Sequence, residues 1–205
     1  FVMSAATTVY TNLDNVMLGF IKGNTEVGYY STAVKVKTVL VSLITSLSAV
    51  LLPRASFFVD NGKFDDFLKL IKKAMNAVFM ISIPAVIFFM VFAKESVLIL
   101  SGNLYLKSVP SMIAIMPTLI FIGVTNVLGI QMMVPMGKER IVLNSVLIGA
   151  LIDLLINLLM IPKYGALGAA TGTLVFKYLG EDNEQVEKAS FTNKGTKYEF
   201  VAKYS

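Results

Sequence analysis

Polar residues recur at every fourth position of one long apolar segment, as Ser145, Gly149, Asp153 and Asn157. Residues four positions apart lie on the same face of a helix. In a membrane helix such a face contacts a neighbouring helix or a water-filled cavity, because exposing an ionisable group to lipid is costly. A carboxylate that is removed from water holds a proton more readily, so Asp153 is a candidate site for a proton or a cation. Structural hydrogen bonding explains the same pattern equally well.

Asp14 interrupts a second apolar segment, which is followed by a polar turn. If the chain folds back at Asn24, Asp14 lies ten residues before the turn and Lys35 eleven residues after it. The two side chains then lie at nearly the same depth on adjacent helices. Opposite charges at one depth can pair, which lowers the cost of burying either of them. We therefore expect Asp14 and Lys35 to meet, either in a transport pathway or as a structural pair.

Lys35 and Lys37 must face opposite ways on a helix, because two positions correspond to about 200° of rotation. Small and polar residues such as Thr38 continue the face of Lys35, whereas the face of Lys37 is more apolar. We expect Lys35 to face a hydrated cavity and Lys37 to extend its ammonium group to the membrane interface. Asn126 and Gln131, in another apolar segment, are further candidates for the pathway.

The composition indicates a membrane protein and excludes several kinds of chemistry. Hydrophobic residues make up 56% of the 205 residues, and the mean hydropathy is +0.73. The net charge of +5 lies mostly between the apolar segments, which indicates membrane topology and contact with membrane lipids rather than nucleic-acid binding. The chain contains neither His nor Cys, which excludes His-based catalysis and disulfides. We expect no metal and no cofactor.

Six apolar segments are each about long enough to cross a bilayer, and they predict an all-α membrane bundle that forms one lobe over residues 1–178. The predicted spans are 2–20, 28–52, 74–93, 108–135, 141–161 and 166–178. Pro53 should end the second span, and Pro84 should kink the third. Apolar residues with helical spacing over 62–74 predict either an amphipathic helix in the headgroup layer or a solvated loop helix. Residues 179–205 are polar and predict a cytoplasmic tail.

The basic residues of the connections predict the orientation in the membrane. One side has seven of them: Arg54, Lys63, Lys69, Lys72, Lys73, Lys138 and Arg140. The other side has four: Lys22, Lys94, Lys107 and Lys163. We expect the richer side, and with it both ends of this segment, to be cytoplasmic. The absence of a basic region before the first span argues against a signal peptide, and we expect the segment to be the interior of a longer polypeptide.

No signature of a soluble enzyme is present. Gly168 and Gly172 form a G-x-x-x-G step inside an apolar helix, which is typical of close helix packing rather than of a ligand-binding loop. No pair of carboxylates and no set of metal ligands converges in the connections. We therefore do not expect an enzyme.

A set of short motifs resembles one family of transporters. The motifs are YTNLDNVMLG at 10–19, VGYY at 27–30, AVKVK at 33–37, LLPR at 51–54, VPMGK at 134–138 and IPKYG at 161–165. Together they cover roughly residues 1–175. The chain resembles the C-terminal lobe of bacterial polysaccharide flippases, which belong to the multidrug/oligosaccharidyl-lipid/polysaccharide exporter superfamily.

The resemblance implies half of a transporter built from two six-helix lobes. It implies translocation of polyprenyl-diphosphate-linked oligosaccharide across the bacterial plasma membrane, with Lys35 and Lys37 meeting the diphosphate and H⁺ or Na⁺ as the coupling ion. A missing N-terminal lobe would act in cis or in trans. The polar residues after Phe176 depart from the family's pattern. A drug/cation antiporter of the same superfamily and a non-transporting membrane fragment or scaffold remain the alternatives.

Overall fold

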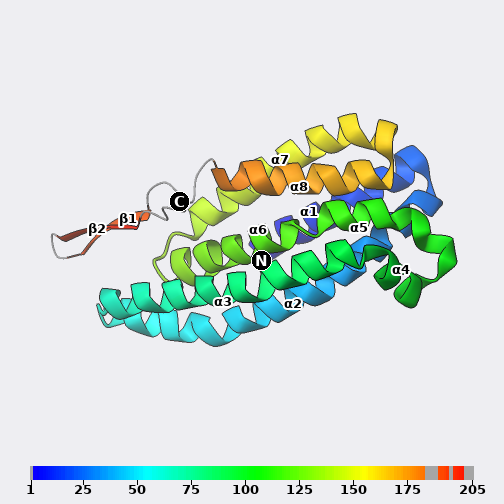
Figure 1. Cartoon of the computed structure of the whole chain (residues 1–205). Helices are drawn as coiled ribbons and strands as arrows, with labels where there is room; N and C mark the ends of the chain where they lie inside the picture. The colour runs from blue at the N-terminus through cyan, green and yellow to red at the C-terminus, as the bar shows by residue number, and fades with distance from the viewer. Residues whose placement is uncertain (1, 183–188, 194–195, 201–205) are drawn as a thin grey trace.

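Two long antiparallel helical hairpins lie on either side of a broken central helix (Figure 1). The computed structural model describes residues 2–182, 189–193 and 196–200. Helices α2 (Asn24–Asp60) and α3 (Phe64–Val91) form one hairpin, and α7 (Glu139–Tyr164) and α8 (Ala166–Asp182) form the other. The broken helix consists of α5 (Val109–Ile115) and α6 (Thr118–Thr125) and packs against both hairpins. Helix α1 (Val2–Lys22) packs against α2 and α7. The prediction of an all-α membrane bundle is confirmed.

The first hairpin of the chain joins α1 (Val2–Lys22) to α2 (Asn24–Asp60) through a single residue, Gly23. Its φ of 87° lies in the left-handed region that glycine adopts without strain. Pro53, which was expected to end the second span, does not end the helix but lies inside α2, and where the span ends stays a prediction. The helix loses one backbone hydrogen bond there, because proline has no N–H group. The 37 residues of α2 are about 55 Å long.

Helix α3 (Phe64–Val91) unites the predicted amphipathic helix 62–74 with the predicted span 74–93. No break in the helix marks residue 74, and where the membrane span begins stays a prediction. The reason is an unbroken buried face that begins at Phe67 and continues through Ile71, Ala74 and Val78. Pro84 also lies inside this helix. Whether the first turns of α3 lie in the headgroup layer stays a prediction.

The predicted span 108–135 consists of several consecutive helical segments rather than one helix. After α4 (Ala93–Ser101) come the 3₁₀-helix η1 (Asn103–Ser108), α5 (Val109–Ile115), α6 (Thr118–Thr125) and the π-helix η2 (Asn126–Met133). The path bends by 46° between Ile115 and Thr118. Pro117 lacks an N–H group there, and the Thr118 hydroxyl donates a 2.5 Å hydrogen bond to the Ile115 carbonyl.

The last hairpin joins α7 (Glu139–Tyr164) to α8 (Ala166–Asp182). By length and composition, three described helices can each cross a membrane, namely α2, α3 and residues 142–164 of α7, and the bent path makes a fourth. Further along the chain, β1 (Ala189–Asn193) pairs antiparallel with β2 (Thr196–Phe200). A strand pair within the polar residues 179–205 was not predicted.

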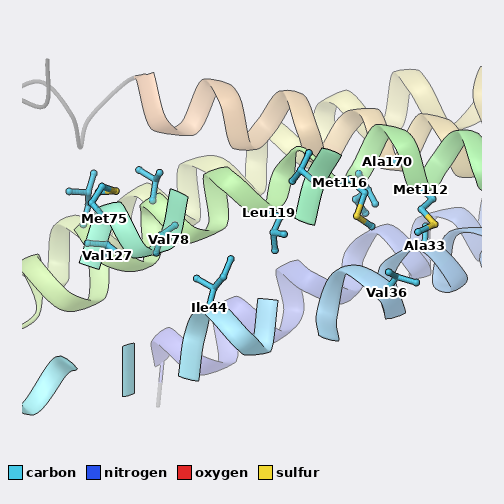
Figure 2. Packing of buried hydrophobic residues seen from close by; sticks show 14 of the residues in the cluster. Ala33, Val36, Ile44, Met75, Val78, Met112, Met116, Leu119, Val127 and Ala170 are labelled. Atoms are coloured by element: carbon cyan, nitrogen blue, oxygen red, sulfur yellow. The ribbon is translucent and has the colours of Figure 1, made fainter. Parts of the chain in front are cut away.

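The core is apolar and forms where the broken helix packs against the α2–α3 hairpin. Ile44 of α2 and Val78 of α3 point toward α6, as Figure 2 shows, and Leu119 lies beside them. Gly123 lies at this contact, and a Cβ atom there would overlap Val78 Cγ1 and approach Ile44 Cγ2 to 3.6 Å. A glycine is therefore needed for this close approach.

Helices α7 and α8 pack even more closely. A Cβ atom on Gly168 would lie 2.5 Å from the Met160 backbone oxygen, and one on Gly172 would overlap Asn157 Oδ1. Both glycines therefore allow α8 to approach α7, so the packing function predicted for the G-x-x-x-G step is confirmed.

Candidate functional site

A cluster of five buried polar side chains lies between four helices. Asp14 comes from α1, Tyr30 from α2, Asp153 and Asn157 from α7, and Thr173 from α8. Asp153 and Asn157 are each 0% exposed and Asp14 is 5% exposed. Burying two carboxylates in one place is costly unless they are paired, hydrogen-bonded or neutralised. The arrangement therefore calls for a compensating charge.

Asp14 is the centre of the cluster. Its Oδ2 accepts hydrogen bonds from the Tyr30 hydroxyl at 2.5 Å and from the Thr173 hydroxyl at 2.9 Å. Its Oδ1 accepts a 2.6 Å hydrogen bond from the Asn157 amide. Three helices thus supply donors to a carboxylate on the fourth. Such charge-assisted hydrogen bonds are roughly twice as strong as neutral ones.

Asn157 links the two carboxylates. Its Nδ2 donates to Asp14 Oδ1 at 2.6 Å and to Asp153 Oδ2 at 3.1 Å. This orientation of the amide is the favourable one, because the flipped form would place the amide oxygen against both carboxylates. The Asn157 Oδ1 atom is buried and has no hydrogen-bond partner among the described residues. It is therefore available to a ligand that offers positive charge.

The cluster contains more oxygen acceptors than protons. Thr173 Oγ1 lies 2.9 Å from Asp14 Oδ2, 2.9 Å from the Ala169 carbonyl oxygen and 3.2 Å from Tyr30 Oη. A hydroxyl has one proton, so Thr173 can donate to only one of these oxygens at a time. A proton on a carboxylate, or a small hard cation that prefers oxygen ligands, would relieve this shortage. Among the described residues no set of three or more His, Cys, Asp and Glu side chains converges, so amide and hydroxyl oxygens would have to complete a cation site.

The structure places Lys37, rather than Lys35, near the buried carboxylates, and Lys35 remains on an exposed face of α2. Lys37 is half-buried and lies close enough to Asp14 and Asp153 for an electrostatic attraction to both. Lys35 is exposed, and the hydrogen bonds to Asp14 come from Tyr30, Thr173 and Asn157 instead. The expected meeting of Asp14 with Lys35 is therefore not found among these contacts, and the expected outward extension of Lys37 is wrong.

The reason is the direction of the buried face of α2. Tyr30, Ala33 and Ile44 define that face. Lys37 follows Tyr30 by seven residues, which is almost two full helical turns, so both point the same way. Lys35 follows Tyr30 by five residues and is rotated by about 140° from it.

Other predicted residues fall into two groups. Gly149 is buried beside Asp153 and Asn157 along α7, so this polar face contacts protein, which was one of the two predicted environments. Asn126 and Gln131 lie in η2, which packs against α2, α3, α6 and α7. Their place in a transport pathway stays a prediction.

Tyr30 and Thr173 were missed by the sequence analysis, and so was Glu26. Glu26 Oε2 accepts a 2.8 Å hydrogen bond from the Ala166 backbone N–H. Its carboxylate therefore caps the N-terminus of α8, where negative charge is favourable. Gly165 has a φ of 56°, and a Cβ atom there would overlap the Glu26 carboxylate. The signal in the sequence was Gly165 itself, because a glycine directly after an apolar segment is typical of a helix end.

Long apolar helices around a buried carboxylate cluster define a multi-pass membrane protein. A family model described as "Polysaccharide biosynthesis protein" matches residues 1–110. The chain therefore belongs to this polysaccharide biosynthesis family. No solved structure matches it.

Three curated relatives extend the similarity to most of the chain. An uncharacterized membrane protein of Methanocaldococcus jannaschii is 28% identical over 179 residues, which are 85% of this chain and 34% of that protein. A putative O-antigen transporter of Shigella dysenteriae is 27% identical over 184 residues, 87% of this chain and 44% of that protein. A probable flippase of Haloferax volcanii is 24% identical over 174 residues, which are 83% of this chain and 36% of that protein. The chain thus spans less than half the length of these relatives.

Proposed function

We propose that this chain is one lobe of a flippase that moves polyprenyl-diphosphate-linked oligosaccharide across the plasma membrane of a bacterium for cell-surface polysaccharide synthesis. Membership of the polysaccharide biosynthesis family and the similarity to a putative O-antigen transporter and a probable flippase support this proposal. A second lobe, in cis or in trans, completes the pathway, because alternating access requires two bodies that move against each other.

The buried carboxylate pair is the observation that carries the proposal of active transport. Asp14 and Asp153 share the Asn157 amide and are both attracted to Lys37. Two negative charges facing one positive charge leave a place for H⁺ or Na⁺. Ionisable groups at membrane depth are typical of ion pathways and proton relays. Binding and release of that ion would change the packing of the four helices that contribute to the cluster.

The exposed face of α2 is the proposed contact surface for the diphosphate. Lys35, Thr38, Ser42 and Ser46 are all exposed along it. The three hydroxyls donate hydrogen bonds to carbonyls of their own helix, which makes the face polar without a partner helix. Such a face is costly against lipid and favourable against a hydrated cavity between lobes. In that cavity the Lys35 ammonium group attracts a phosphate as a point charge.

Replacement of Lys35 by Ala in the cell of origin tests the flippase proposal. We expect loss of surface polysaccharide at an unchanged level of the protein in the membrane. The matched control is Lys107→Ala, which removes an exposed lysine from η1. Normal surface polysaccharide in the Lys35→Ala strain would contradict the proposal, and altered resistance to cationic drugs instead would favour the antiporter alternative.

Thermal unfolding of the purified chain tests the ion site separately. We expect NaCl, compared with choline chloride, to raise the Tm of the wild type. Asp14→Asn should abolish this rise, because the amide cannot carry the negative charge that attracts the ion. An equal rise in the variant would locate the ion elsewhere.

A further inference from the structure

The exposed face of α3 changes its chemical character in steps from the N-terminus onward. Asp65 and Asp66 come first, then Lys69, Lys72 and Lys73, and then Asn76. From Met80 onward the same face is apolar, and Met80 itself is 81% exposed. Spacings of three and four residues place these side chains on one side of the helix. The order is acid, base, amide and hydrocarbon.

This order matches the layers of a lipid leaflet, which run from water through the phosphate groups to the hydrocarbon chains. The exposed apolar face of α3 ends at Val91, and α4 continues with the exposed Lys94 and Glu95. A hydrocarbon core of about 30 Å corresponds to about 20 helical residues. Counting back from Val91, the core ends close to Lys72. The lysines therefore lie at the level of the lipid phosphates, and the aspartates lie in the water beyond.

The side chains also point in the favourable direction. Cα–Cβ bonds in a helix tilt toward its N-terminus, which here is the end outside the hydrocarbon. The three lysine side chains thus extend away from the membrane core and toward the headgroups. The Lys69 ammonium group lies 3.7 Å from the Asp66 carboxylate, in an exposed pair. Lys72 and Lys73 are exposed and have no ion-pair partner among the described residues.

The neighbouring tip of α2 and the turn after it add two basic groups, beside the exposed Asp60 at the end of α2. Arg54 lies 5.7 Å above the Phe58 ring, and Lys63 lies 5.9 Å above the Phe57 ring. Phe57 is itself exposed. Basic groups combined with an exposed aromatic ring are typical of surfaces that lie in the interfacial layer.

We propose that Lys69, Lys72 and Lys73 form a binding surface for the headgroups of anionic phospholipids. The surface lies near the tip of the α2–α3 hairpin, at the opposite end of the bundle from the α7–α8 turn (Figure 1). It holds this end of the lobe at the phosphate layer of the leaflet. The proposal goes beyond the proposed function, since it holds whatever the chain transports.

Native mass spectrometry of the full chain in neutral detergent tests the surface. The chain is titrated with phosphatidylglycerol or with phosphatidylcholine, and the ratio of the two apparent affinities is measured. The test variant is Lys69→Gln/Lys72→Gln/Lys73→Gln. The matched control is Lys22→Gln/Lys94→Gln/Lys107→Gln, which removes three exposed lysines from other parts of the lobe and changes the net charge equally.

We expect the test variant to lose preference for phosphatidylglycerol by about fivefold for each unpaired lysine removed at low salt. The control variant should retain the preference. All six lysines are exposed, so both variants should keep the Tm of the wild type. Equal losses in both triple variants would indicate a response to net charge only and would overturn the proposal. Complete displacement of the lipid by millimolar inorganic phosphate would likewise overturn it, because the site would then recognise free phosphate.

Discussion

The Glu26 carboxylate accepts a 2.8 Å hydrogen bond from the backbone N–H of Ala166, although 140 positions separate the two residues. The contact joins the first turn of α2 to the first turn of α8. Both helices also supply the cluster, through Tyr30 and Thr173, whose hydroxyls lie 3.2 Å apart. The Glu26 contact therefore fixes the relative position of two helices that meet again at the Asp14 carboxylate.

Glu26→Ala should destabilise the lobe by about 1–2 kcal/mol, because it removes both a cap and a negative charge from the N-terminus of α8. Glu26→Gln should cost less, since it keeps an acceptor oxygen and loses only the charge. Thermal unfolding in detergent measures both variants. Equal stability of the wild type and Glu26→Ala would mean that water replaces the carboxylate at no cost.

Gly172→Ala should destabilise the lobe by about 1–3 kcal/mol, because the added methyl group overlaps the Asn157 side chain. The loss should be accompanied by a weaker response of the Tm to sodium. Gly19→Ala is the matched control, since its methyl group would meet Val27 Cγ2 at an ordinary 3.5 Å. That control should be neutral or stabilising by about 0.5–1 kcal/mol, because alanine is the better helix former. If Gly19→Ala were destabilised as much as Gly172→Ala, the loss at Gly172 could not be attributed to overlap with Asn157.

Tyr30→Phe should destabilise the lobe by about 1–3 kcal/mol, because Asp14 loses one of its hydrogen-bond donors in a buried site. The same substitution in an Asp14→Asn background should cost less, since the charge-assisted bond is already lost. A double-mutant cycle measured by unfolding isolates the coupling between the two side chains. Strictly additive effects would argue against a direct bond.

Lys37→Met should destabilise the lobe, because it removes the cation that attracts Asp14 and Asp153 and leaves two buried carboxylates without it. Lys35→Met should change stability by less than about 0.5 kcal/mol, as is usual for exposed positions. Both substitutions replace a lysine by methionine, and they differ only in which face of α2 carries the residue. Similar losses for both would contradict the assignment of Lys37 to the interior.

The charged and amide side chains of the cluster could be predicted, because they lie within otherwise apolar segments of the sequence. Asp14, Asp153 and Asn157 were found because ionisable and amide groups are rare at membrane depth. Tyr30 and Thr173 could not be found in this way. Tyrosine and threonine are ordinary residues in membrane helices, and only the packing of four helices brings their hydroxyls to Asp14.

Lys37 was misplaced for a different reason. Polarity of neighbouring positions indicated two faces of α2 correctly, but it did not decide which face the lobe buries. Large buried side chains decide that, and here Tyr30 and Ile44 place Lys37 inside.

Prolines gave equally ambiguous signals in the fold. Pro53 and Pro84 lie within unbroken helices, whereas Pro117 coincides with a 46° bend. The three residues have the same covalent restriction, so the difference arises from packing around them and from Thr118, whose hydroxyl satisfies a carbonyl at the break.

The length of α2 has a mechanical consequence. Tyr30 joins the helix to the Asp14 cluster near one end, and the remaining 30 residues to Asp60 form an arm of about 45 Å. A tilt of about 10° at the cluster would move the far tip by about 8 Å, because displacement grows in proportion to the length of a rigid arm. Because α2 packs against α3, the hairpin would move as one body, and its tip would move farther than the roughly 5.4 Å between neighbouring helical turns.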